Sequence, residues 1–118
     1  MSMGRKILAV VLGTVTAGLA IAGVEMLAHG RITGDALFAA VAAGYGLGAF
    51  AGSLVAFRLS GARWTAVAVT GILALLAIGN LFALPHPMWF VPVAAVTLAA
   101  GHAAAIAVSR RSGGQALS

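Results

Sequence analysis

The sequence predicts an all-α membrane protein, a bundle of four transmembrane helices arranged as two antiparallel hairpins. Three observations support this fold class: 62% of the residues are hydrophobic, only 8% are charged, and four long apolar stretches follow one another. A soluble domain carries about 25% charged residues, so this chain could not cover a water-exposed surface. A spanning helix needs about 20 apolar residues, and four such spans leave room only for short loops. We therefore expect one membrane domain over residues 1–118.

The positions of the basic residues predict how the spans are oriented. Six of them lie before the first span, around the break between the second and third spans, or after the fourth span, which are all on one side of the membrane: Arg5, Lys6, Arg58, Arg63, Arg110 and Arg111. Only Arg31 falls in the opposite set of loops, close to Asp35. This positive-inside pattern predicts that both termini are cytoplasmic. It also accounts for the net charge of +5, so nucleic acid is not expected as a partner.

Residue types that several kinds of chemistry need are missing. The chain has no cysteine, which excludes disulfides, thiolate metal sites, iron–sulfur clusters and covalently attached haem. The sequence shows no Ser-His-Asp set, no pair of carboxylates and no glycine-rich loop for phosphate. We therefore expect neither an enzyme nor a bound cofactor.

The first predicted span covers residues 7–28 and has a polar end. One face of this helix holds Thr14, Gly18, Ala22, Glu25 and His29. The stretch also looks like a secretory signal, with a basic start and a small-x-small triplet at residues 20–22. Because the apolar run continues past this triplet, and because cleavage would leave an odd number of spans, we expect the span to be retained.

The second predicted span, residues 36–59, carries a stripe of small residues spaced four apart. Its members are Ala40, Gly44, Gly48, Gly52 and Ala56. Residues four apart lie one above the other on a helix, so the stripe lets another backbone approach closely, as in a glycine zipper. We expect it to pack helices, within the chain or between two chains. A groove that faces lipid or a pore is the alternative.

Short polar breaks separate the first three spans. Gly30 can end the first helix by adopting the left-handed conformation, and Thr33 or Asp35 can cap the second. The break at residues 58–63 is a tight turn, and two helices joined this closely must be antiparallel neighbours.

The third and fourth predicted spans cover residues 64–84 and 89–109. A Pro-His-Pro break separates them, because proline disfavours helix in the residue that precedes it. Trp64 and Trp89 suit the headgroup level at opposite ends of the bundle. His102 lies toward the cytoplasmic end, where we expect it to pack against a neighbouring helix. The alternative is a haem ligand shared across a dimer.

Four polar residues are predicted to meet at the outer end of the bundle: Glu25, His29, Asn80 and His86. Glu25 and Asn80 each lie about four residues from the outer end of their spans, and so at matching depth. A charge at the centre of a membrane helix costs about 2.5–3.5 kcal/mol, and less toward its ends, so Glu25 requires a partner. The first interpretation of this pocket is structural, with Glu25 bonded to Asn80 or to a histidine.

Two functional interpretations of the pocket stay open. Glu25 can be the proton- or cation-binding site of a small transporter or channel. Glu25, His29 and His86 can also hold a divalent metal, but the spacing is common by chance and we assign no metal ligand. Tyr45 lies near mid-membrane, where its hydroxyl needs a partner. We expect it to pack and hydrogen-bond, with a pore-lining role as the alternative.

Three segments resemble a group of small bacterial four-span membrane proteins of unknown function. In residues 25–29, Glu is followed by His late in the first span. Residues 44–59 are the Gly-rich second span that ends in a basic turn, and in residues 80–90 Asn precedes Pro-His-Pro-x-Trp. The similarity extends over residues 7–110, although the first outer loop, often long and proline-rich in the group, is short here. The resemblance implies a bacterial inner-membrane protein and implies no activity.

The sequence thus favours a small, non-enzymatic membrane protein with a polar pocket near the outer leaflet. The alternative function is a proton- or cation-coupled transporter or channel that uses Glu25, and a second alternative is a metal- or lipid-binding membrane protein. The expected partners are the lipid bilayer and either a second copy of the chain or another membrane protein.

Overall fold

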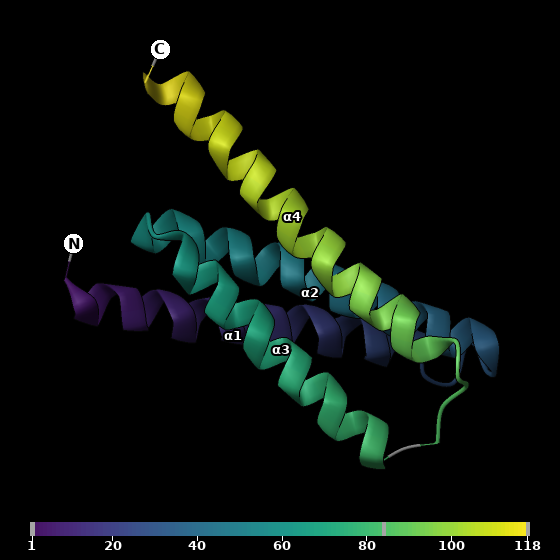
Figure 1. Ribbon diagram of the computed structural model, residues 1–118. Helices are drawn as coiled ribbons and strands as arrows, with labels where there is room; N and C mark the ends of the chain where they lie inside the picture. The colour runs from purple at the N-terminus through teal and green to yellow at the C-terminus, as the bar shows by residue number, and fades with distance from the viewer. Residues whose placement is uncertain (1, 84, 118) are drawn as a thin grey trace.

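Four helices make up the described fold. The computed structural model describes residues 2–83 and 85–117, with side chains as far as residue 110. The helices are α1 (Met3–Ala28), α2 (Asp35–Ser60), α3 (Arg63–Ala83) and α4 (Phe90–Leu117), and the described residues contain no strand (Figure 1). Each helix has a stretch long and apolar enough to cross a membrane. The prediction of an all-α, multi-pass membrane bundle is thereby confirmed.

Two helices are longer than predicted. α1 begins at Met3, because Ser2 caps it by accepting a hydrogen bond from the Arg5 backbone N–H at 3.2 Å. α4 does not end near Ser109 but continues to Leu117. Both extensions lie at the end of the bundle that holds the two termini (Figure 1).

The start of α2 corrects the predicted cap. Neither Thr33 nor Asp35 caps this helix; its N-cap is Gly34, with a φ of +65° that suits glycine, and no side chain accepts a capping bond there. Asp35 is instead the first helical residue, and its Oδ1 accepts a 3.4 Å hydrogen bond from the Trp89 indole N–H. That bond links the two loops at this end. Gly30, as expected, follows α1 with a left-handed φ of +78°.

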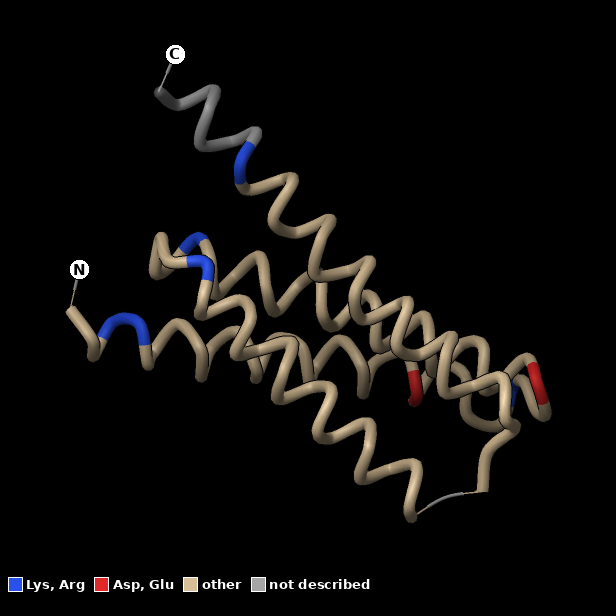
Figure 2. Tube along the Cα trace, in the orientation of Figure 1, with Lys and Arg blue, Asp and Glu red and all other residues tan. Residues whose placement is uncertain are grey.

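Charge distinguishes the two ends of the bundle. Figure 2 shows most Lys and Arg residues at the end where the two termini lie, and both acidic residues, Glu25 and Asp35, toward the opposite end, where Arg31 is the one basic residue. We call these the basic end and the acidic end. Because successive helices run in opposite directions, both chain termini belong to the basic end.

α2 occupies the centre of the bundle and packs against the other three helices. It lies closest to α1 where glycines meet. A Cβ added to Gly52 would lie 2.6 Å from the Gly13 carbonyl oxygen, and one added to Gly48 would lie 2.8 Å from the Ile21 side chain. Gly44 faces α1 along the same line. At these three positions the small residues of α2 pack within the chain.

A second close seam joins α2 to α4. Gly101 of α4 lies against the carbonyl group of Gly46, and a Cβ added to Gly46 would lie 3.0 Å from the Thr97 carbonyl oxygen. The sequence did not predict this seam. α2 therefore presents small residues to two partners at once, which makes it the most buried of the four helices.

α3 and α4 make the smallest contact of any helix pair that touches, and each packs instead on α2. In Figure 1 they run apart from one another across the bundle. The second hairpin is therefore open, unlike the tightly packed pair α1 and α2. Within the described residues α1 and α4 do not pack against each other.

Candidate functional site

A cavity of about 340 Å³ opens at the acidic end of the bundle, with walls from all four helices and from the loop between α3 and α4. Its lining residues are Glu25, His29, Leu37, Phe38, Val41, Tyr45, Asn80, Leu81, Pro85, His86 and Phe90. The four residues expected from the sequence to meet here all line this one cavity. Most of the remaining wall is apolar or aromatic.

The local structure of each element explains how these side chains converge. Glu25 lies in the last turn of α1, and His29 is the C-cap residue that follows this helix. They are four residues apart and therefore share a face. Asn80 lies in the last turn of α3, and His86 follows in the loop between two prolines. The prolines keep this loop out of helix, so His86 stays at the cavity while α3 diverges from α4.

The Glu25 carboxylate faces this cavity without a partner from the protein. The side chain is half-buried, and no hydrogen bond or ion pair to its carboxylate occurs among the described side chains. The expected bond from Asn80 or from a histidine is therefore wrong for this structure. An ionised carboxylate in such a place depends on whatever enters the cavity to offset its lost hydration.

Asn80 bonds to Tyr45 instead. The Asn80 Nδ2 donates a 3.0 Å hydrogen bond to the Tyr45 phenolic oxygen, and Tyr45 is only 3% exposed. This bond supplies the partner that a tyrosine buried in a membrane helix requires. It also crosses from α2 to α3, which contact each other less than α2 contacts α1 or α4. The phenolic O–H still has a proton to donate, because among the described residues its oxygen only accepts.

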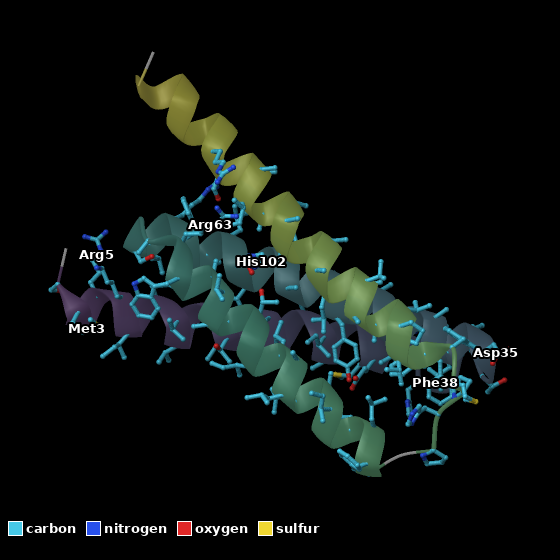
Figure 3. The ribbon with its side chains drawn as sticks, viewed as in Figure 1. Met3, Arg5, Asp35, Phe38, Arg63 and His102 are labelled. Atoms are coloured by element: carbon cyan, nitrogen blue, oxygen red, sulfur yellow. The ribbon has the colours of Figure 1, made fainter. Side chains whose placement is uncertain are left out.

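Aromatic rings form one wall of the cavity, with Phe90 at their centre. The Phe90 ring lies edge-on to Phe38 at a centroid distance of 5.4 Å, and it is tilted against Tyr45 at 6.4 Å and against His86 at 6.1 Å. Phe38 is labelled in Figure 3 at this end of the molecule. The sequence analysis missed both phenylalanines as site residues. The spacing of seven between Phe38 and Tyr45, which places them on one helix face, was the available signal.

The arrangement does not favour a metal. No group of three or more His, Cys, Asp or Glu side chains in the described part of the chain is close enough to hold a metal ion. His29 and Glu25 both line the cavity, but His29 is exposed at the end of α1, and among the described residues the two belong to no metal-binding group. The polar groups of the cavity are thus one carboxylate, two histidines and the Tyr45–Asn80 pair, among aromatic and apolar side chains.

A second polar cluster lies nearer the basic end. His102 of α4 has its Nδ1 2.8 Å from the Thr70 hydroxyl of α3 and 3.2 Å from the Ser53 hydroxyl of α2. The two hydroxyls are themselves 3.0 Å apart. Figure 3 shows His102 at this crossing of helices. The expectation that His102 packs against neighbouring helices describes this position, and sequence reasoning had found neither of its hydroxyl partners.

An apolar layer separates this cluster from the cavity. On α2, α3 and α4 the buried side chains between the two polar regions are apolar: Ala49, Leu73, Ala77, Ala94 and Leu98. Thr97 of α4 lies between them as well, but it is half-buried and its hydroxyl donates to the Ala94 carbonyl oxygen of its own helix. Side chains packed in this way leave no polar route from Glu25 to His102 through the bundle. The two regions are therefore separate sites.

No protein-family model, curated protein sequence or solved structure matches this chain. The resemblance to small four-span membrane proteins therefore stays a prediction.

Proposed function

We propose that this protein is a non-enzymatic membrane component that binds a lipophilic organic cation in the cavity at the acidic end. The observation that carries the proposal is the Glu25 carboxylate, which faces an aromatic cavity without a hydrogen bond or ion pair from the described side chains. With the positive-inside orientation, both termini are cytoplasmic and the cavity lies in the outer leaflet of a bacterial inner membrane.

The chemistry of the walls supports a cation with an apolar body. An ammonium group beside Glu25 would neutralise the carboxylate and offset the hydration that it loses on burial. The faces of aromatic rings attract a cation within about 6 Å of the ring centre, and Tyr45 and Phe90 both line the cavity. Leu37, Val41 and Leu81 provide the apolar surface for the rest of the ligand.

The size of the cavity also suits a small organic molecule. Ligand pockets in proteins measure about 300–1,000 Å³ and are mostly apolar with a few convergent polar groups. This cavity has about 340 Å³ and combines one carboxylate, one Tyr–Asn pair and two histidines with a largely apolar wall. A ligand about the size of a benzylammonium ion fits these limits.

Binding is favoured over transport by the apolar layer below the cavity. A proton- or cation-coupled transporter that uses Glu25 would need a polar path toward the basic end. Leu73, Ala77 and Leu98 are buried in that direction. Intramembrane carboxylates on ion paths commonly continue into further polar groups, and the nearest cluster, at His102, is walled off from Glu25.

A binding measurement tests this function. The protein is placed in lipid nanodiscs and titrated calorimetrically with benzyltrimethylammonium, and benzenesulfonate serves as a probe of similar size and opposite charge. We expect the cation to bind and the anion not to bind. Glu25→Gln should weaken cation binding at least about tenfold, or about 1.4 kcal/mol, because the amide cannot neutralise an ammonium group.

Asp35→Asn is the matched control for this substitution. Asp35 is the other acidic residue of the chain, lies at the same end and does not line the cavity. Its replacement should leave the dissociation constant unchanged. An equal loss of affinity in both variants would show that the cation responds only to surface charge. Unchanged cation binding in Glu25→Gln would contradict the proposed function.

A further inference from the structure

A groove of about 390 Å³ lies between α3 and α4, on the basic side of the apolar layer. Its lining residues are Val67, Thr70, Gly71, Ala74, Ala99 and His102. It exists because α3 and α4 diverge and because small residues line both of its walls. It is separate from the cavity that contains Glu25 and faces the membrane on the open side of the bundle.

Two arginines flank the basic end of this groove. Arg63 is the first residue of α3, seven residues before Thr70, and Arg110 lies on α4, eight residues after His102. At 1.5 Å per residue these separations are about 10 and 12 Å, so both arginines stand at nearly the same height above the Thr70–His102 bond. Figure 3 shows Arg63 at the basic end of the molecule near His102.

Both guanidinium groups are available for a ligand. Arg63 and Arg110 are exposed, and neither makes a hydrogen bond or ion pair to the side chains that the structure describes. Trp64 follows Arg63 and is 45% exposed, as is typical of tryptophan at the headgroup level of a bilayer. The two arginines therefore stand at the depth of lipid phosphates, where basic residues between helices bind anionic headgroups.

The floor of the groove adds a hydrogen-bonding group. His102 uses its Nδ1 for Thr70 and Ser53, and within the described residues its Nε2 has no hydrogen-bond partner. The Thr70 hydroxyl can donate to Nδ1 or accept from it, so both neutral tautomers of His102 keep this bond. In the tautomer that is protonated on Nε2, that nitrogen is a free donor. A polar hydrogen that faces hydrocarbon without an acceptor is costly. An ester carbonyl of a lipid is an acceptor that the membrane itself supplies at this place.

We infer that the groove holds one phospholipid with an anionic headgroup, its phosphate between Arg63 and Arg110 and one acyl chain along Gly71 and Ala74. The lipid belongs to the leaflet at the basic end. This site is independent of the cation proposed for the opposite end, because it uses none of the same residues.

Native mass spectrometry tests the headgroup part of this inference. The protein is equilibrated in detergent with equal amounts of phosphatidylglycerol and phosphatidylcholine of the same chain length. We expect one phosphatidylglycerol to be retained in preference to phosphatidylcholine. Arg63→Gln should lower that preference about fivefold, the effect of one basic residue near an anionic surface. Lys6→Gln removes the same charge at the same end, on α1, and should change the preference little.

A second pair of variants tests the acyl-chain part. A Cβ at Gly71 meets nothing within 4 Å and Gly71 lines the groove, so Gly71→Leu adds a side chain that starts in open space and extends into the groove. Gly79 is equally open but does not line the groove, which makes Gly79→Leu the matched control. We expect Gly71→Leu to abolish lipid retention and Gly79→Leu to preserve it.

Three results would overturn the inference. If Arg63→Gln and Lys6→Gln lowered the preference for phosphatidylglycerol equally, the lipid would be attracted by the positive charge of this end in general and not by a specific site. Undiminished retention in Gly71→Leu would show that the groove does not hold the chain. Displacement of the lipid by inorganic phosphate at the same concentration would show that the headgroup alone is recognised.

Discussion

At the scale of single residues, the bond between Asn80 and Tyr45 determines the shape of the cavity. Tyr45 is buried on α2, whereas Asn80 lies on α3, the helix that diverges from α4. The 3.0 Å bond holds these two helices together at the acidic end. It also orients the Asn80 amide toward Tyr45, and within the described residues no hydrogen bond joins Asn80 to Glu25.

Replacement of Tyr45 by Phe should therefore loosen this end without disturbing the rest. The variant keeps the ring contact with Phe90, centroid to centroid 6.4 Å, and removes only the acceptor for Asn80. Hydrogen bonds between membrane helices contribute about 0.6 kcal/mol on average, so we expect a loss of that order in the free energy of unfolding.

A double-mutant cycle with Asn80→Ala measures this contribution. If the bond is the cause, Tyr45→Phe should cost little once Asn80→Ala is present, and the coupling energy should be about 0.6 kcal/mol. Strictly additive losses would show that the two side chains act separately.

At the scale of helices, α2 organises the fold because small residues occupy two of its faces. The face with Gly44, Gly48 and Gly52 receives α1, and Gly46 receives α4 at Gly101. In a bilayer, helices gain little by burying large apolar side chains, because lipid is equally apolar, so close backbone packing decides which helices join. α3 has no glycine at such a contact, since a Cβ at Gly71 or at Gly79 would meet nothing within 4 Å.

Alanine substitutions of glycine should separate these roles. In Gly52→Ala the new Cβ would lie 2.6 Å from the Gly13 carbonyl oxygen and 2.9 Å from Ala17, and the two backbones must move apart. We expect a loss of about 1–3 kcal/mol in the free energy of unfolding, the usual cost of overpacking.

Gly18→Ala is the control for this substitution. A Cβ at Gly18 on α1 meets nothing within 4 Å, and alanine is the better helix former by about 1 kcal/mol, so this variant should be as stable as the parent or more stable. The measurement is thermal unfolding of both variants in the same detergent. Equal behaviour of the two would contradict the packing role of Gly52.

At the scale of the whole molecule, the sequence was sufficient to predict the four helices. Apolar stretches of spanning length, separated by glycine- or proline-containing breaks, predict the number of helices because only a helix satisfies the backbone inside a bilayer. Counting residues from the helix ends also placed Glu25 and Asn80 at the same depth, and both line the cavity.

The sequence was not sufficient to predict how the helices meet. Lipid can cover any apolar helix face, so the hydrophobic pattern does not predict which helices pack together. For the same reason it does not predict that α3 and α4 make little contact. Two residues at the same depth in the membrane also need not face each other, because depth does not determine which way each helix face points. For that reason Asn80 was assigned to Glu25, although it bonds to Tyr45. Ser53 and Thr70 lie far from His102 in the sequence, and only the fold brings their hydroxyls to its ring.

The molecule has two separate polar regions, the cavity at the acidic end and the cluster around His102, with buried apolar side chains between them. Glu25 lines the cavity at the acidic end. The chain has two acidic residues, Glu25 and Asp35, so Glu25 is its only glutamate. A single glutamate means that a selectively labelled protein reports on this one carboxylate without overlap.

The most direct measurement is carbon-13 NMR of protein labelled at the glutamate side-chain carboxyl, in lipid nanodiscs, during titration with benzyltrimethylammonium. The account predicts one resonance that shifts and saturates at one cation per chain, with the dissociation constant found by calorimetry. A resonance that stays unchanged while the cation binds would contradict the account, because the carboxylate would then take no part in binding.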